Sequence, residues 1–254
     1  SRRVRRFGST LPVFLPQHTV PYAAAGFMDS QSPNFIVTES IKQMRRHYLF
    51  LPPLFYYLCS HMIEYKKKIL ANGLTVVVNR DPVSKLAAVN ILYRVGARNE
   101  NPERTGFAHL FEHLMFRGTR RIPNLDLPVQ MACGDNNAFT NNDYTDFYIT
   151  LPKDNVETAL WLESDRMEGL DITPEKLKTE KRVVIEEFRQ RYLNQPYGDQ
   201  PMLLRALAYK VHPYRWATIG LTPEHIAQAT PDEVQAFYRA HYRPSNAILS
   251  ISAD

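Results

Sequence analysis

Hydrophobic and polar residues alternate in short runs from residue 63 onward, and this pattern predicts β-strands. Residues 68–78 form two β-prone stretches on either side of Asn72-Gly73, a dipeptide typical of hairpin turns. Further apolar runs predict strands at 86–95, 145–151 and 246–252.

In most of the remaining sequence the apolar residues recur with a helical period. This spacing predicts helices at about 105–117, 154–168, 174–193, 199–210 and 231–242. The last of these opens with Thr230-Pro231-Asp232-Glu233, a capping box with proline in the first helical position. Strands that are followed by mixed helices and strands predict an α+β layer fold.

Residues 1–61 differ from the rest of the chain. Prolines recur there without any hydrophobic period, so we expect a disordered or adventitious extension before a domain at 62–254. The alternative is a signal peptide, because the basic run 44–47 precedes about a dozen apolar residues that end at Cys59. That stretch is too short to span a membrane. A natural start at Met62 favours a cytoplasmic protein, whereas a signal peptide implies export to the periplasm.

The charge distribution argues against a nucleic-acid-binding surface. The 254 residues include 31 Lys and Arg against 26 Asp and Glu, a formal net charge of +5. Residues 1–68 have a net charge of +7 and the remaining residues a net charge of −2, so the folded body lacks the basic face that nucleic acid requires. The two cysteines, Cys59 and Cys133, lack Cys-x-x-Cys spacing, and we expect neither a disulfide nor a thiolate zinc site.

The predicted helix at 105–117 carries residues suited to metal-ion chemistry. His109 and His113 are four residues apart, so their imidazoles stand on one helix face and can bind a single tetrahedral zinc ion. Glu112 lies beside them, where its carboxylate can reach a water on the metal. We expect Thr105 to cap the start of this helix and Gly118 to end it.

The alternative, that both histidines are ordinary core residues, fits this helix poorly. Its other positions are almost all apolar, so we expect the helix to be buried nearly all round. Burying two imidazoles and a carboxylate without partners costs several kcal/mol. A bound metal ion removes that cost and uses all three side chains.

Two imidazoles leave a zinc ion short of a protein ligand, and the helix predicted at 174–193 offers carboxylates. On a helical wheel Glu180 and Glu187 lie together on one flank of the apolar stripe, whereas Glu186 points toward solvent. The stripe itself consists of Leu177, Val184 and Phe188. Their position on the helix favours Glu180 and Glu187 as residues of the metal site.

The segment His109-Leu110-Phe111-Glu112-His113 matches the inverted His-x-x-Glu-His motif of a class of zinc peptidases, the inverzincins. With the two downstream glutamates, residues 62–254 resemble the first domain of the pitrilysin/insulinase family. That family includes the mitochondrial processing peptidases, with the β subunit as the similar chain, and many bacterial homologues. The resemblance implies a mainly antiparallel sheet with helices packed on one face.

The resemblance also implies roles for individual residues. Glu187 would join His109 and His113 as the third zinc ligand, and Glu180 would be a supporting acid near the site. Glu112 would act as general base toward a zinc-activated water. The implied activity is that of a metalloendopeptidase that hydrolyses peptide bonds of extended peptides with Zn²⁺ as cofactor.

The segment Asn137-Ala138-Phe139-Thr140 stands where the family has an edge strand that pairs with the substrate backbone. These four residues are therefore the candidate substrate-binding residues, and the expected partner is a peptide or protein. Without the resemblance, the segment is a polar turn that leads into a strand.

Family members consist of two homologous halves, and the second supplies groups that grip the substrate. This chain ends before such a half could begin, so we expect a second half in the same parent chain or in a partner subunit. The alternative function is a non-catalytic or partner-dependent subunit, although such subunits usually have a broken motif and this motif is intact. A membrane-anchored binding module would rest on residues 44–59 alone, so a membrane role is not expected.

Overall fold

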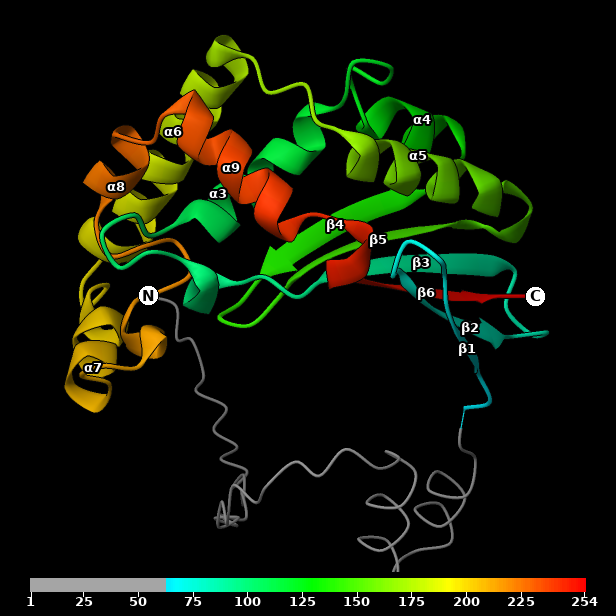
Figure 1. The fold of residues 1–254 in the computed structure, drawn as a ribbon, viewed down its shortest axis with the longest axis horizontal. Helices are drawn as coiled ribbons and strands as arrows, with labels where there is room; N and C mark the ends of the chain where they lie inside the picture. The colour runs from blue at the N-terminus through cyan, green and yellow to red at the C-terminus, as the bar shows by residue number, and fades with distance from the viewer. Residues whose placement is uncertain (1–62) are drawn as a thin grey trace, which may run out of the picture. The chain divides into compact units, whose positions relative to one another are not determined.

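The structure is a computed structural model that describes residues 63–254; the predictions made for residues 1–61 lie outside this part. Within it six strands form one sheet in the order β1-β2-β6-β3-β5-β4 (Figure 1). All neighbouring pairs are antiparallel except β2 and β6, which confirms the mainly antiparallel sheet. The strands are β1 (Lys66–Ile69), β2 (Thr75–Arg80), β3 (Leu86–Tyr93), β4 (Asp135–Thr140), β5 (Thr145–Pro152) and β6 (Ala247–Ala253).

The predicted hairpin joins β1 to β2 through a turn at residues 70–74. The amide of Gly73 donates to the carbonyl of Leu70, and the amide of Leu70 donates to the carbonyl of Leu74, each at 2.9 Å. Gly73 has a φ of +87°, and a Cβ there would lie 2.8 Å from Cβ of Ser245. The turn therefore needs glycine for its backbone angle and for close packing against Ser245 in the 3₁₀ turn before β6.

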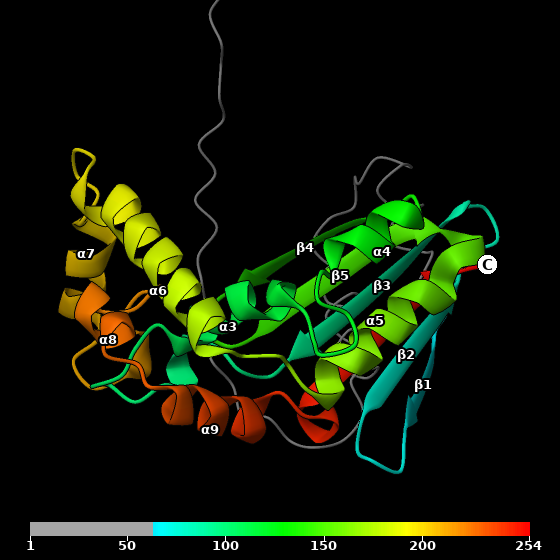
Figure 2. The same cartoon turned by 90° about the horizontal axis from the view of Figure 1, so that it is seen from above.

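As predicted, helices pack on one face of the sheet, where α4 and α5 lie across the strands, while α6, α7 and α8 lie beyond the strand ends (Figures 1 and 2). The short helices α4 and α8 were not predicted, and the helix predicted at 174–193 is α-helical only to Phe188 before a π-helical turn, Arg189–Leu193. No helix within residues 63–254 is both long and apolar enough to cross a membrane. The helices are α3 (Phe107–Leu114), α4 (Asp126–Met131), α5 (Val156–Glu168), α6 (Pro174–Phe188), α7 (Gln200–Ala208), α8 (Pro223–Ala227) and α9 (Pro231–His241).

Three helices begin with the same local sequence, a threonine followed by proline and an acidic residue. In α6 and α9 the threonine hydroxyl accepts a hydrogen bond from the amide three residues later. Glu233 completes the predicted capping box of α9 by accepting from the amide of Thr230 at 2.8 Å. The three starts, at Thr173, Thr222 and Thr230, fix where α6, α8 and α9 leave the preceding loops.

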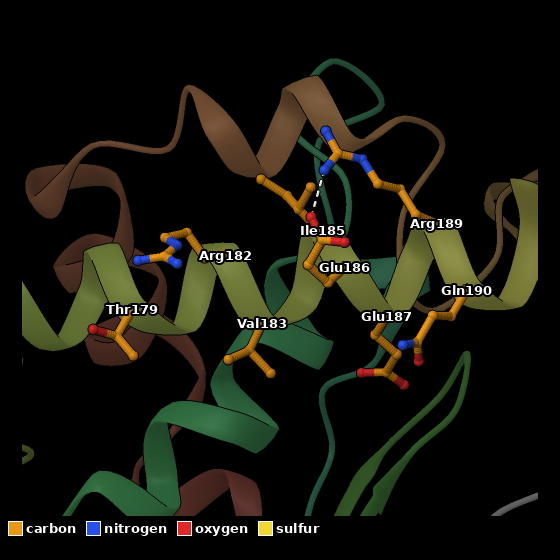
Figure 3. Close-up of a pocket in the computed structure, with 8 residues that line it drawn as sticks. All are labelled: Thr179, Arg182, Val183, Ile185, Glu186, Glu187, Arg189 and Gln190. Carbon is orange, nitrogen blue, oxygen red and sulfur yellow. Dashed lines mark hydrogen bonds and ion pairs between the residues drawn. The ribbon is translucent and has the colours of Figure 1, made fainter. Parts of the chain in front are cut away.

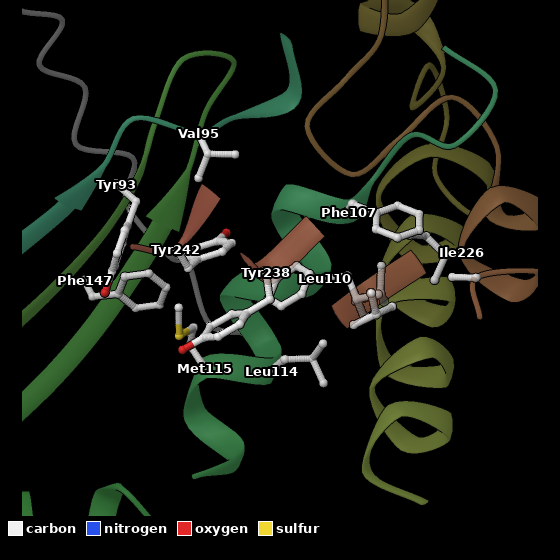
Figure 4. Packing of buried hydrophobic residues seen from close by; sticks show 14 of the residues in the cluster. Tyr93, Val95, Phe107, Leu110, Leu114, Met115, Phe147, Ile226, Tyr238 and Tyr242 are labelled. Carbon is white, nitrogen blue, oxygen red and sulfur yellow. The ribbon is translucent and has the colours of Figure 1, made fainter. Parts of the chain in front are cut away.

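Buried and exposed side chains alternate along the strands, and the helices cover the face that carries the buried ones. In β3 the residues Ala87, Val89, Ile91 and Tyr93 are buried, and their neighbours along the strand are exposed or half-buried. Two apolar clusters form beneath the helices, one around α3 and the other beneath α4 and α5. In the first, the rings of Tyr93 and Tyr242 lie 5.0 Å apart at the end of the sheet nearest α3 (Figure 4). The cluster thus fixes α3 against the sheet.

Candidate metal centre

The start of α3 is set by a residue that the sequence analysis missed. Glu100 accepts hydrogen bonds from the amides of Gly106 and Ala108 at 2.8 and 2.9 Å, and Gly106 takes a left-handed φ of +93°. A carboxyl group suits this position because unpaired amides and the helix dipole meet there. Burial raises the pKa of Glu100 to about 8, although these amide contacts lower it.

The prediction that Thr105 caps α3 is wrong. Its hydroxyl instead accepts from the amide of Leu221 at 2.8 Å and lies 2.9 Å from Nδ1 of His225. Thr105 therefore ties the loop before α3 to the segment that leads into α8. Gly118, at the other end, lies beyond a 3₁₀ turn with a φ of +81°, which agrees with a helix stop there.

His109 and His113 stand one turn apart on α3, with ring centroids 4.8 Å from each other. The helix is buried on nearly every side, and α6 packs along it so that Glu187 faces both rings. Oε2 of Glu187 lies 3.6 Å from Nε2 of His109 and 3.3 Å from Nε2 of His113. Three potential ligand atoms therefore converge on one point from two helices.

The distances from Oε2 of Glu187 to the two histidine nitrogens fit a tetrahedral metal ion, and the three candidate ligand atoms all lie within 4.8 Å of one another. Zinc bonds of about 2.0–2.1 Å place neighbouring tetrahedral ligand atoms about 3.3 Å apart. Two imidazole nitrogens and one carboxylate oxygen are also the donors of many catalytic zinc sites, in which the fourth position is left open. The His-His-Glu cluster could thus hold a metal ion with one position free.

The two histidines differ in their protonation. Burial lowers the pKa of His109 to about 4, which leaves its ring neutral at pH 7. Burial also lowers the pKa of His113, but hydrogen bonds from that ring to Glu180 and Glu187 outweigh burial and raise the pKa to about 9. At pH 7 and without a metal ion, both ring nitrogens of His113 are therefore protonated, and each faces one of these carboxylates.

Glu180 lies behind His113 and is almost fully buried. Its Oε2 is 3.5 Å from Nδ1 of His113, and its Oε1 pairs with Arg117 at 2.5 Å. Burial raises the pKa of Glu180, but the contacts with His113 and Arg117 outweigh burial and lower it. Glu180 therefore touches the ring nitrogen that points away from the cluster, and Arg117, which no sequence pattern singled out, balances its charge.

Glu112 borders a hollow beside the cluster. The hollow has a volume of about 280 Å³, and its lining consists of Glu112, His113, Phe116, Arg117, Asp126 and Glu180. Burial raises the pKa of the Glu112 carboxyl, while a hydrogen bond with the Thr140 side chain lowers it. A carboxyl group thus faces an accessible space next to the converging ligand atoms.

The segment Asn137–Thr140 forms most of β4, one of the two edge strands of the sheet, rather than a turn. Asn137 and Phe139 are exposed, and Ala138 and Thr140 are half-buried on the side of α3. Within residues 63–254, β4 pairs only with β5, so its outer backbone groups have no strand partner.

Neighbouring glutamates on α6 point in different directions (Figure 3). Glu186 is 61% exposed and pairs with Arg189, as expected for a solvent-facing residue. Glu187 points away from that pair and is 20% exposed. Its Oε1 lies 2.8 Å from a guanidinium nitrogen of Arg191, a contact that the Glu-to-Arg spacing of four could have indicated.

Sequence comparison shows which known proteins this chain is similar to. The family model described as "Insulinase (Peptidase family M16)" matches residues 75–220. The chain is 33% identical over 198 residues to the zinc protease PqqE of Helicobacter pylori, with 77% of this chain and 44% of that protein covered. It is 26% identical over 191 residues to a probable mitochondrial-processing peptidase subunit beta of Arabidopsis thaliana, with 74% and 35% covered.

Solved structures agree with the fold. A crystal structure of a protease from Helicobacter pylori superposes with a TM-score of 0.73 at 32% identity and covers 76% of this chain and 47% of that one. A putative M16-like peptidase from Alicyclobacillus acidocaldarius gives a TM-score of 0.68 at 24% identity, with 75% and 46% covered, which supports the fold alone. The chain spans less than half the length of these relatives.

Proposed function

Because this chain belongs to the insulinase family of peptidases, we propose that it is the zinc-binding and catalytic part of a metalloendopeptidase. The observation that carries the proposal is the convergence of Nε2 of His109, Nε2 of His113 and Oε2 of Glu187. These three residues would hold zinc, which when bound supplies a Lewis acid and lowers the pKa of a bound water to about 7. The zinc protease names of several relatives support the choice of metal.

Glu112 is the proposed general base. It borders the hollow beside the cluster, and burial raises the pKa of its carboxyl toward the range in which a group can both accept and return a proton. The Thr140 side chain on β4 lowers that pKa, so the carboxyl lies close to β4. In this position Glu112 would take a proton from the attacking water and deliver it to the leaving amine.

Glu180 is the proposed supporting acid. A carboxylate that accepts from the far nitrogen of a ligand histidine orients the ring and strengthens it as a donor. Nδ1 of His113 lies 3.5 Å from Oε2 of Glu180, which fits that arrangement.

The proposed substrate is an extended peptide that adds to the outer edge of β4. The backbone groups of Asn137, Ala138, Phe139 and Thr140 would pair with the peptide backbone, and specificity would come from side-chain contacts on alternate residues. Since Thr140 lies close enough to Glu112 to influence its pKa, a peptide on this edge passes close to the proposed base.

A second homologous half is the proposed partner, either in the same parent chain or in another subunit. Two observations support it: the relatives are more than twice the length of their match to this chain, and some of them are named as a subunit of a processing peptidase. Hydrogen-bond donors aimed at the developing oxyanion contribute about 10²–10³ in rate each, and a second half would supply them.

The test measures zinc content and hydrolysis of unstructured peptides for the chain alone and with the second half of its parent protein. We expect close to one equivalent of zinc in both samples, little turnover from the chain alone, and strong turnover when the second half is present. Glu112→Gln should abolish turnover and leave zinc bound. Absence of zinc from the wild-type chain would rule out the proposed metal centre, and full activity of Glu112→Gln would rule out the proposed base.

A further inference from the structure

Glu187 uses its two carboxylate oxygens for different contacts. Oε2 faces the Nε2 atoms of both histidines, at 3.6 and 3.3 Å. Oε1 faces Arg191, with a guanidinium nitrogen at 2.8 Å. The guanidinium therefore contacts the other oxygen of the same carboxylate.

The backbone around Arg191 is held in an unusual turn. Directly after α6 the chain makes one π-helical turn, in which the amide of Asn194 donates to the carbonyl of Arg189 at 2.8 Å. The buried ring of Phe188 packs on Tyr192, with centroids 5.4 Å apart, and this contact anchors the turn to the core.

A glutamate side chain has enough rotational freedom to offer a metal ion one oxygen or both. A partner that occupies Oε1 removes the second option and fixes the direction of Oε2. Arginine suits this role, because its planar guanidinium keeps its charge and binds a carboxylate in a defined geometry.

We propose that Arg191 is a positioning residue of the metal centre, which holds Oε1 of Glu187 so that Oε2 alone is presented to the metal ion. This inference rests on the proposed function for the role of Glu187 as a ligand. It assigns no contact between Arg191 and the metal ion or the substrate.

The positioning role and a simple charge effect predict opposite results. A cation beside the site repels Zn²⁺, so if charge alone mattered, removal of Arg191 would strengthen zinc binding. If Arg191 positions Glu187, its removal should weaken zinc binding, by about 10–100-fold as for other groups that orient metal ligands.

The chain contains a matched control. Arg189 pairs with Glu186 on the same stretch of helix, and that pair faces solvent away from Glu187. Arg189→Ala therefore removes the same type of side chain and the same type of ion pair without touching the cluster.

The experiment measures the zinc dissociation constant of the full 254-residue chain by competition with a chelator. Arg191→Ala should bind zinc about 10–100-fold more weakly than wild type, Arg191→Lys should fall in between, and Arg189→Ala should bind within about twofold. Visible spectra of the cobalt-loaded proteins report coordination directly, since absorption weakens when the coordination number rises. We expect a weaker spectrum for Arg191→Ala only, as Glu187 is freed to use both oxygens.

Thermal unfolding of the metal-free variants serves to compare their folding. Zinc binding by Arg191→Ala as tight as or tighter than wild type would overturn the positioning role, and so would an unchanged cobalt spectrum. Equal weakening by Arg189→Ala would overturn it as well. A wild-type chain that binds no zinc would overturn the proposed function itself, and this inference with it.

Discussion

Nδ1 of His113 lies 3.5 Å from Oε2 of Glu180, on the side of the ring opposite to Glu187. One imidazole is thus placed between two carboxylates that come from the same face of α6, seven residues apart. Glu180 and Glu187 lie on one flank of the helix, but they contact opposite nitrogens of the His113 ring. Substitution of each glutamate should therefore have a different effect.

Glu187→Gln should remove tight zinc binding, and Glu180→Gln should weaken it by about 10–100-fold. The first change replaces a proposed ligand atom, whereas the second removes only the group that orients His113. Zinc content after dialysis against a weak chelator distinguishes the two variants. Equal zinc loss in both would mean that the proposed roles are wrongly divided between them.

His113→Ala should abolish tight zinc binding, because a single imidazole and one carboxylate do not complete the three-ligand set. Glu186→Gln should leave the zinc content unchanged, since that side chain is 61% exposed and pairs with Arg189 away from the cluster. Metal analysis of both proteins checks this. Undiminished zinc in the His113 variant would exclude that residue as a ligand.

Zinc affinity of the wild-type chain should rise with pH. The pKa of His113 in the metal-free protein is about 9, raised by Glu180 and Glu187 against the effect of burial, so zinc must displace one proton at lower pH. His109, with a pKa lowered to about 4 by burial, is already neutral. The dissociation constant should therefore fall about tenfold per pH unit between pH 6 and pH 8.

Glu180→Gln provides the control for that titration. The substitution replaces one of the two carboxylates that raise the pKa of His113 by a neutral amide, so less proton competition remains and the pH dependence should be shallower. Identical slopes in wild type and variant would show that the His113–Glu180 contact does not govern the proton.

Stability should depend on pH through Glu100. Burial raises the pKa of this carboxyl from 4.5 to about 8, so the folded protein keeps a proton that the unfolded chain releases. The associated stability is complete below about pH 4.5 and is lost as the pH rises through about 8, at about 1.4 kcal/mol per pH unit.

Glu100→Gln mimics the protonated carboxyl and should lack this loss. Urea unfolding of metal-free wild type and variant between pH 5 and pH 8 measures the difference, because other titrating groups contribute equally to both. Parallel curves would show that Glu100 is ionised in the folded state.

Local sequence patterns predicted the elements that carry the candidate site. Two helices carry this site, one with His109 and His113 and the other with Glu180 and Glu187. In both helices the spacing of apolar residues along the sequence indicates which side is buried. The cap of α3 was mispredicted because Thr105 has the chemistry of a cap, and nothing local shows that Glu100 is folded back onto the same amides.

Contacts between distant segments were beyond the sequence patterns. Arg117, in the 3₁₀ turn after α3, pairs with Glu180 because α3 and α6 lie side by side. The pairing of β6 with both β2 and β3 depends on strands that meet only in the folded sheet. The start of α8 could have been predicted from the sequence, since Thr222-Pro223-Glu224 repeats the pattern that begins α6 and α9.

The position of β6 has a consequence for the order of assembly. β6 is synthesised after all the other strands in residues 63–254, yet it lies between β2 and β3 at the centre of the sheet. Until β6 is made, the β1–β2 hairpin and the β3–β5–β4 unit lack the strand that joins them, and each presents an unpaired strand edge to other chains. Pairing of Tyr93 with Ala247 closes a very long loop, which makes this step slow. Nascent chains stalled before β6 should therefore be the species most prone to aggregate.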